Sequence, residues 1–445
     1  MLYLAHGGAD ADISDDELES LFSSALKQAL QARKGSGPVL ILPPDLTRFH
    51  SRAGLLTDIA CRVLGGIDFA VMPALGTHMV MTDAEIRRMF PGSPPEKFFV
   101  HDWRNDVAEL GRLEAGWVEK VSEGAVCYDW PVQVNKRLIN GGYSLIVSIG
   151  QVVPHEVIGM ANYAKNLFVG CGGKEAIDKS HFLGAVYGME RMMGRMNTPV
   201  RALFDEGLRR FKDRLPPVLW VLTVVGARGE KETASGGKPA ALPPSSTAVR
   251  GIFCGDDREC FEKAAHLARE VNVDILDEPI KKAVVYLEPE EFRTTWLGNK
   301  AVYRTRMAMA DGGELLILAP GLERFGEDMG MDALIRKYGY RPGNVIRELV
   351  GKEQDIAGNL SAASHLIHGS SEGRFTIRYC PGVGLSRAEV ESVGFEWGCL
   401  DQALARYDIK KLRLGWNTHA DDERFFYVPN PALGLWVERK RFVEE

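Results

Sequence analysis

Three short apolar runs, each followed directly by a polar segment, constrain the fold of this chain more than any other feature. The runs are 39–42, 69–75 and 145–149. Helical patterns follow the first two of them, beginning near Ala53 and Thr82. Because strands that alternate with helices in this way form parallel sheets covered by helices, the sequence predicts an α/β fold with mostly parallel sheets.

The polar residues beyond these runs are candidates for one shared site. Asp45 and Arg48 follow the first run, His78 follows the second and His155 the third. The ligand crevice of an open α/β sheet lies outside the carboxyl ends of its strands, so we expect these side chains to face it. Each one alone has a simpler interpretation, as a helix N-cap, a solvated arginine or a hydrogen-bonded loop histidine. Their common position favours a functional role.

The segment from His155 to His181 contains many residues that could act as metal ligands, bases or reactive amines. The glycines of this stretch suit a turn or a phosphate-binding loop, but the glycine-to-lysine spacing of a P-loop is absent. An H-E-x-x-H zinc helix is absent too, since Met160 occupies the second histidine position. The lysines and glycines concerned are Lys165, Lys174, Lys179, Gly170, Gly172 and Gly173.

Composition narrows the class of protein. The net charge is −6, and no basic face interleaved with aromatic residues occurs, so nucleic acid is not an expected partner. The seven cysteines include no C-x-x-C pair, which is typical of a reducing cytoplasm and not of a disulfide framework. Neither a signal peptide nor an apolar stretch of roughly 18 residues occurs. We therefore expect a cytoplasmic protein without a membrane partner.

Four short motifs occur together in the first part of the chain. They are Asp45-Leu46-Thr47-Arg48, Gly76-Thr77-His78, His155 with Lys165 ten residues later, and His181 sixteen residues beyond Lys165. In this combination the chain resembles the nickel-dependent lactate racemase family, whose members racemise or epimerise 2-hydroxy acids with a nickel-pincer nucleotide. The motifs make the resemblance strong over the first two-thirds of the chain.

The resemblance implies a role for each motif. Lys165 would carry the nucleotide covalently as a thioamide, and His181 would ligate nickel. His78 and His155 would be the two acid/base groups, which suits the chemistry, since inverting a secondary alcohol carbon requires a base on either face. The partners would be a small 2-hydroxy acid and proteins that make the cofactor. The residues holding the cofactor would be Asp45, Leu46, Thr47, Arg48 and Val169.

The 445 residues suffice for two or three domains. We predict a cofactor-binding and catalytic domain at 1–275, a second α/β domain on the substrate side at 276–424, and an extension at 425–445 that packs across the domains, with the active site in the cleft between the two domains. In the second domain, strands at 283–287 and 314–319 flank a helical pattern at 292–310. Trp296, Lys300 and Arg304 are spaced by four on that pattern and are candidate substrate-binding residues, together with Arg48. A solvated basic face with one packed tryptophan explains the spacing equally well.

Two departures from the family pattern concern the substrate. The resemblance implies a substrate-binding lysine, which Lys300 matches, but the glutamine expected three residues earlier is Leu297. The tryptophan of the lactate enzymes is missing near Leu360, where His365 and His368 lie instead. A sugar acid of the gluconate or mannonate kind, or malate, is therefore a better candidate than lactate.

Two other functions fit the same residues. The first is a zinc or other divalent-metal hydrolase with His78, His155, His181 and Asp45 as ligands, which requires no adduct on a lysine. The second is a non-enzymatic binding protein for an organic anion, in which Arg48 and Lys300 hold a carboxylate. Metal analysis distinguishes the first from a racemase, and ligand binding without His78 and His155 distinguishes the second.

Overall fold

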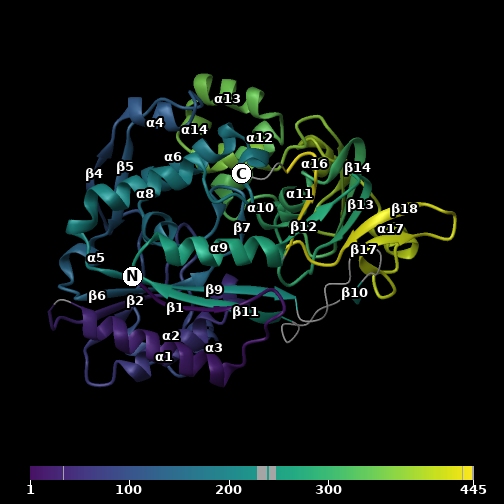
Figure 1. The fold of residues 1–445 in the computed structure, drawn as a ribbon. Coiled ribbons are helices and arrows are strands. Elements are labelled where there is room, and N and C mark those ends of the chain that lie inside the picture. The colour runs from purple at the N-terminus through teal and green to yellow at the C-terminus, as the bar shows by residue number, and fades with distance from the viewer. Residues whose placement is uncertain (34, 228–237, 240–246, 433, 443–445) are drawn as a thin grey trace. The chain divides into compact units, whose positions relative to one another are not determined.

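The chain folds into two compact units (Figure 1). The computed structural model describes residues 1–33, 35–227, 238–239, 247–432 and 434–442. The first unit takes its residues from Met1–Leu183, Gly194–Arg228 and Ser246–Val271, and the second from Gly184–Met193, Gly229–Ser245 and Asn272–Glu445. In the described part of the chain, no helix is both long and apolar enough to cross a membrane.

The first unit is built on a six-stranded sheet with the order β1-β11-β9-β6-β2-β3. Four neighbouring strands, β9, β6, β2 and β3, are parallel, while β11 runs antiparallel to β9 and β1 antiparallel to β11. The three predicted strands are β2, β3 and β6, of which β3 ends early, before Pro73. The bounds are β1 (Leu2–Gly7), β2 (Val39–Leu42), β3 (Phe69–Val71), β6 (Leu145–Gln151), β9 (Val218–Ala227) and β11 (Thr247–Gly255).

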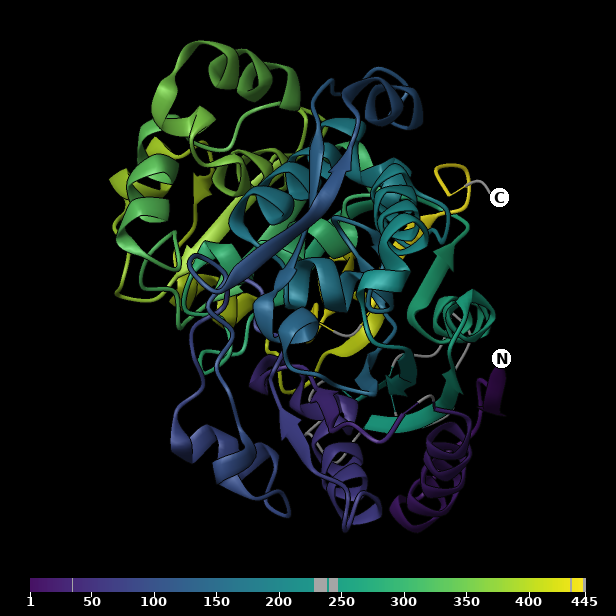
Figure 2. The same cartoon turned by 90° about the vertical axis from the view of Figure 1, so that its left-hand side faces the viewer.

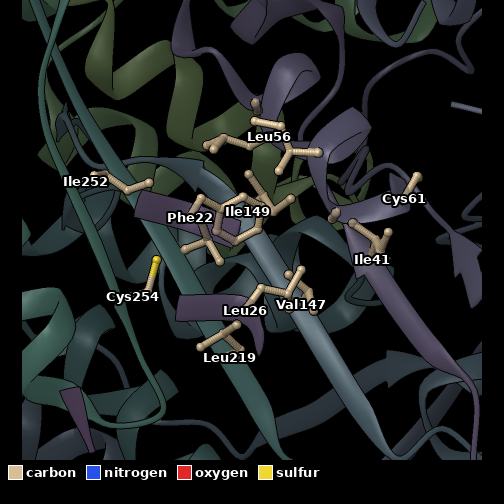
Figure 3. Close-up of a cluster of buried hydrophobic side chains, with 14 of the residues drawn as sticks. Phe22, Leu26, Ile41, Leu56, Cys61, Val147, Ile149, Leu219, Ile252 and Cys254 are labelled. Carbon is tan, nitrogen blue, oxygen red and sulfur yellow. The ribbon is translucent and has the colours of Figure 1, made fainter. Parts of the chain in front are cut away.

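Helices cover both faces of this sheet. On one face, α1 (Asp15–Ala32) and α2 (Ala53–Val63) bury their apolar sides against the strands, and Figure 3 shows Phe22 and Leu26 of α1 packed beside Val147 and Ile149 of β6. Ser14 caps α1 by accepting the N–H of Glu17. On the opposite face lies α9 (Arg258–Asn272), as Figure 1 shows. The α/β fold with mostly parallel strands is thus confirmed.

The rest of the first unit consists of short elements. The antiparallel pair β4 (Val107–Leu113) and β5 (Trp130–Asn135) faces the viewer in Figure 2. The predicted capped helix after β3 is present as α3 (Asp83–Met89), with a complete capping box between Thr82 and Glu85. Other helices are α4 (Ala115–Val121), α5 (Lys136–Asn140), α6 (Lys174–Tyr187), α8 (Pro199–Phe211) and the 3₁₀ segments η1 (Leu46–Ser51), η2 (Pro95–Lys97) and η4 (Lys212–Arg214).

The second unit contains a seven-stranded sheet with the order β10-β17-β18-β13-β14-β15-β16. Its strands β18, β13, β14, β15 and β16 are parallel, and β12 pairs in parallel with β19. Residues 424–438 supply β18 and β19. The bounds are β10 (Lys238–Pro239), β12 (Val273–Leu276), β13 (Ile280–Tyr286), β14 (Met309–Ala319), β15 (Thr376–Pro381), β16 (Glu396–Trp397), β17 (Arg413–Thr418), β18 (Arg424–Val428) and β19 (Leu435–Glu438).

The helical pattern at 292–310 is not one helix. It forms α10 (Thr295–Gly298) and α11 (Lys300–Thr305), which are separated at Asn299. Glycine and asparagine are both poor helix formers, and their adjacency at 298–299 explains the break. Elsewhere the unit contains α7 (Met189–Met192), α12 (Met329–Tyr338), α13 (Gly343–Lys352), α14 (Gln354–Ala357), α15 (Leu360–His368), α16 (Arg387–Ser392) and α17 (Leu400–Arg406).

Candidate active site

The strand order of the first sheet identifies where a ligand is expected. From β2 the chain moves outward to β3 on one side, and from β6 it moves outward to β9 on the other. The order therefore reverses between β2 and β6, and such a switch point forms a crevice at the carboxyl ends of the strands. Asp45 follows β2 at this point, and His155 follows β6.

Asp45 and His78 form a hydrogen-bonded pair beyond β2 and β3. One carboxylate oxygen of Asp45 accepts a hydrogen bond from Nδ1 of His78 at 2.5 Å. The other accepts hydrogen bonds from the backbone N–H and the hydroxyl of Thr47, at 3.1 and 2.5 Å. Asp45 is buried, which alone would raise its pKa, but the bonds with His78 and Thr47 hold the pKa of Asp45 below its ordinary value. Since Nδ1 carries the proton toward Asp45, Nε2 of the neutral ring has a free lone pair.

Leu46, Thr47 and Arg48 belong to η1, which begins directly after Asp45. Leu46 packs against the hydrophobic core, and Thr47 holds Asp45 as described above. The Arg48 side chain has no hydrogen-bond or ion-pair partner within the described residues. Arg48 is therefore the member of this motif with a charged group available to an anion.

In His155 the proton lies on the other ring nitrogen than in His78. It lies in β7 (Pro154–His155), which pairs with β8 (Gly159–Met160), and its Nδ1 accepts the N–H of Val157 at 3.1 Å. The neutral ring must therefore carry its proton on Nε2. Burial keeps the pKa of His155 well below its ordinary value, and the positive charges of Lys165 and Arg48 lower it further. The charges of Lys165 and Arg48 therefore both act on His155.

Lys165 immediately precedes η3 (Asn166–Gly170), a π-helical turn of the kind often found at functional sites. Its side chain is half-buried, and its amine has no hydrogen bond or ion pair to any residue that the structure describes. Burial, reinforced by the charge of Arg48, lowers the pKa of Lys165 to about 8. A substantial fraction of the amine is therefore neutral near physiological pH, which makes it nucleophilic.

His181 lies on α6 and presents one ring nitrogen as a possible metal ligand. Its Nδ1 donates a hydrogen bond to the carbonyl of Ile177 at 2.8 Å, so Nε2 carries a lone pair. Burial, together with the charge of Lys165, lowers the pKa of His181 to about 4. No three His, Cys, Asp or Glu side chains of the described chain are grouped so that they could hold a metal ion by themselves.

The loop after β3 and the glycine cluster are joined by their backbones. The N–H of Gly76 donates to the carbonyl of Gly170 at 2.9 Å, and Val169 lies against Gly76. A Cβ on Gly172 would lie 2.0 Å from the carbonyl oxygen of Phe168, so only glycine fits there. The glycine cluster therefore serves a tight approach between loops.

His101 was missed in the sequence, because it follows no predicted strand. It is buried, its Nε2 donates to the carbonyl of Gly172 at 3.0 Å, and its Nδ1 accepts from the Asn135 side chain at 3.0 Å. It therefore holds the glycine cluster in place. Asn166 was missed as well; its side chain donates to the Ser148 hydroxyl and the Leu42 carbonyl, at 2.9 and 3.2 Å. Only the proximity of Asn166 to Lys165 could have indicated it.

Replacing His101 by leucine should destabilise the protein by about 1–3 kcal/mol at pH 7.5, since the Gly172 carbonyl loses its donor. Burial lowers the pKa of His101, so as the pH falls below about 6.5 the unfolded state takes up a proton that the folded state does not. Acidification therefore lowers the free energy of unfolding of the wild type through His101, and the leucine variant has no such loss. The difference between them in urea unfolding should thus be smaller near pH 5.5 than near pH 7.5; an equal or larger difference would contradict this role.

The three predicted substrate residues of the second unit differ in environment. Trp296 stacks on His365 of α15, with the ring centroids 4.3 Å apart. The ammonium of Lys300 lies 5.5 Å from the centre of the Phe292 ring, and Arg304 is only 3% exposed. A solvated basic face is therefore wrong for Arg304. His365 is held by the hydroxyls of Tyr303 and Tyr340, each at 2.8 Å.

Comparisons with known proteins agree with these observations. The chain is similar over 98% of its length to two solved structures: a protein from Thermotoga maritima (21% identity, TM-score 0.77, all of that chain covered) and the lactate racemase apoprotein from Thermoanaerobacterium thermosaccharolyticum (16% identity, TM-score 0.67, 96% covered). These likenesses concern the fold. A search of curated proteins found no match. Residues 13–193 match the family model described as the lactate racemase N-terminal domain, which confirms the resemblance seen in the sequence. Residues 13–193 are therefore similar to the lactate racemase N-terminal domain.

Proposed function

We propose that this protein is a racemase or epimerase that inverts C2 of a 2-hydroxy acid, using a nickel-pincer nucleotide attached to Lys165. The observation that carries the proposal is the Lys165 amine: it has no partner in the described chain, its pKa is lowered to about 8, and its charge acts on both His155 and His181. Such an amine, within a lactate racemase N-terminal domain, is suited to covalent attachment.

The residues present fit this cofactor. An amide-like bond requires a neutral amine, which the lowered pKa of Lys165 favours. An unprotonated imidazole beside sulfur donors suits nickel, and His181 offers such a nitrogen through Nε2. Because the nucleotide brings its own donors, a single protein ligand suffices. When bound, the group supplies an electron-poor pyridinium that accepts a hydride and returns it.

The two histidines would handle the hydroxyl proton. His78 starts with a bare Nε2 and a carboxylate behind its Nδ1, so it is prepared to remove the proton and to hold it as imidazolium. His155 starts with Nε2 protonated, so it is prepared to donate. For the opposite stereoisomer the roles exchange, which requires His155 to present the other tautomer and to lose the bond from Val157.

Several cationic side chains are candidates for binding the substrate. Arg48, whose guanidinium has no hydrogen-bond or ion-pair partner among the described residues, suits the carboxylate of the acid. From the second domain, proposed at 276–424, we retain Trp296, Lys300 and Arg304. The tryptophan of the lactate enzymes is missing near Leu360, where α15 begins. Trp296 stacks on His365 of α15, so the indole of a different residue lies next to this helix. A sugar acid or malate remains our proposed substrate.

The decisive experiment is production with nucleotide-maturation proteins in the cytoplasm. Intact mass should show one nucleotide adduct, metal analysis should show nickel, and chiral chromatography should show interconversion of one pair among lactate, malate, gluconate and mannonate isomers. Bound zinc without an adduct would instead indicate a hydrolase. Anion binding that survives loss of both His78 and His155, without turnover, would indicate a binding protein.

Replacing Asp45 by asparagine should lower kcat by about 10²-fold or more, because His78 loses the carboxylate that fixes its tautomer and stabilises its cation. Steady-state rates with both stereoisomers measure this. Thr47→Val is the matched control, since it removes one hydrogen bond to Asp45 but leaves the contact with His78; its loss should be much smaller. Equal rates in Asp45→Asn and the wild type would contradict the pairing.

Replacing His181 by alanine should strongly reduce nickel content while the nucleotide stays on Lys165, because the metal ligand and the tether are different residues. Metal analysis and peptide mass spectrometry of the same sample measure both quantities. The exposed His6, replaced by alanine, is the control for loss of an imidazole. Unchanged nickel in His181→Ala would show that another residue is the ligand.

A further inference from the structure

Two consecutive residues just before Lys165 have left-handed backbone conformations. Asn162 has φ 68° and Tyr163 has φ 59°. Asparagine tolerates this region, but a bulky tyrosine rarely enters it. Such conformations persist only when the surrounding structure enforces them, and they concentrate at functional sites. The surroundings of this pair therefore indicate what it serves.

Arg201 on α8 binds the backbone at and just before this pair of residues. Arg201 is 1% exposed, and its guanidinium donates to the carbonyl of Asn162 through both terminal nitrogens, at 3.2 and 3.3 Å, and to the carbonyl of Met160 at 2.6 Å. It also lies 4.2 Å from the centre of the Phe261 ring. A planar guanidinium can bind two carbonyls at once, whereas a lysine ammonium lacks this fixed fork.

Packing fixes the two side chains as well. The Tyr163 ring contacts Trp220 and Phe261, with centroids 4.5 and 5.4 Å apart. The Asn162 side chain accepts the N–H of Tyr163 at 2.7 Å and lies against β6, where a Cβ on Gly150 would be 2.0 Å from its amide nitrogen. On the other side of Lys165, Asn166 is bound to β6 and β2. Lys165 is thus fixed from both directions along the chain.

We propose that Arg201 and Asn162 are positioning residues for Lys165: Arg201 holds the left-handed turn at Asn162 and Tyr163, and the turn fixes the Lys165 amine at the point of cofactor attachment. This rests on the proposed function for the purpose of the amine, but not for its placement. Burial and Arg48 lower the pKa of Lys165 most, and the charge of Arg201 contributes further. Arg201 therefore acts on the amine through the backbone and through its charge.

The test measures the Lys165 amine in full-length protein made without the cofactor. Competitive labelling with acetic anhydride over a range of pH, read by peptide mass spectrometry, gives the midpoint for this one lysine. In the wild type the midpoint should lie near 8. In Arg201→Met and in Asn162→Val, whose β-branched side chain opposes the left-handed turn, it should rise by about one unit or more toward the ordinary lysine value.

Two controls separate positioning from general damage. Asn162→Gly keeps the left-handed turn and should keep the wild-type midpoint. Arg250→Met removes another buried arginine, which donates to the carbonyls of Ala11 and Ala227, and should also leave it unchanged. The proposal would be overturned if the labelling midpoint of Lys165 did not change in Arg201→Met and Asn162→Val, or if it rose equally in Arg250→Met. If Arg201→Met does not fold, the two Asn162 variants decide, because both retain the arginine charge. Labelling needs no nucleotide, so a shift without any adduct in matured protein would refute the proposed function and leave the positioning role standing.

Discussion

Replacement of Lys165 by alanine should remove both the nucleotide adduct and all racemase activity, because no other amine among the residues that the structure describes shares its surroundings. Intact and peptide mass spectrometry of matured protein, together with chiral analysis of the product, measure the two losses. Lys165→Met should unfold at the same or a higher temperature at pH 7: since the folded state disfavours the charged amine, removing the amine relieves a cost. Unfolding would therefore not explain the loss.

Lys174 and Lys179 are the matched controls for Lys165. Lys174 is bound to Asp178 at 2.5 Å, and Lys179 to Glu175 at 2.7 Å, so each amine already has a carboxylate partner. Alanine at either position should leave the adduct on Lys165. An adduct on one of these two lysines, or none after successful maturation, would refute the assignment of the tether.

Replacement of either His78 or His155 by glutamine should slow turnover in both directions by about 10²- to 10⁴-fold, the usual effect of losing a positioned acid or base. Both directions should suffer because each cycle uses one histidine as base and the other as acid. The measurement is interconversion of each stereoisomer, followed by chiral chromatography, for every substrate that the parent enzyme accepts.

Stability and cofactor content control this experiment. His78 is exposed, with 54% of its side chain accessible, so its replacement should change unfolding only through the lost contact with Asp45 and leave the fold intact. Nickel and adduct should remain in both variants, since neither histidine is the proposed ligand or tether. A single variant that keeps near-wild-type rates with either isomer would show that the reaction does not need two bases.

Strand ends were the predictable part of this site. The apolar runs predicted β2, β3 and β6, and parallel pairing then required Asp45 and His78 to lie at one edge, where they bond at 2.5 Å. Lys165 and His181 could be named only through the family resemblance, because a lysine in a loop and a histidine on a helix carry no signal of their own. The electrostatic influence of Lys165 on both His155 and His181 supports their grouping.

The parts that sequence reasoning missed depend on tertiary packing. His101 donates a hydrogen bond to the carbonyl of Gly172, and Arg201 donates to the carbonyls of Met160 and Asn162. Every residue has a backbone carbonyl, so the sequence does not indicate which one a side chain binds. The left-handed turn at Asn162 and Tyr163 is equally invisible, since tyrosine is a poor indicator of positive φ. The prediction of a single helix at 292–310 was wrong, because the spacing of Trp296, Lys300 and Arg304 by four suggested that the helix continues through Asn299.

The edges of the first sheet affect how the protein behaves in concentrated solution. One edge, β3, is only three residues long and is followed by Pro73, and the other, β1, has an irregular register between Leu2 and Leu4. Short or irregular edge strands are poor templates for pairing with another chain, which guards against aggregation. The loops beyond the strand ends can therefore vary in length and polarity without exposing a long sheet edge to neighbouring molecules.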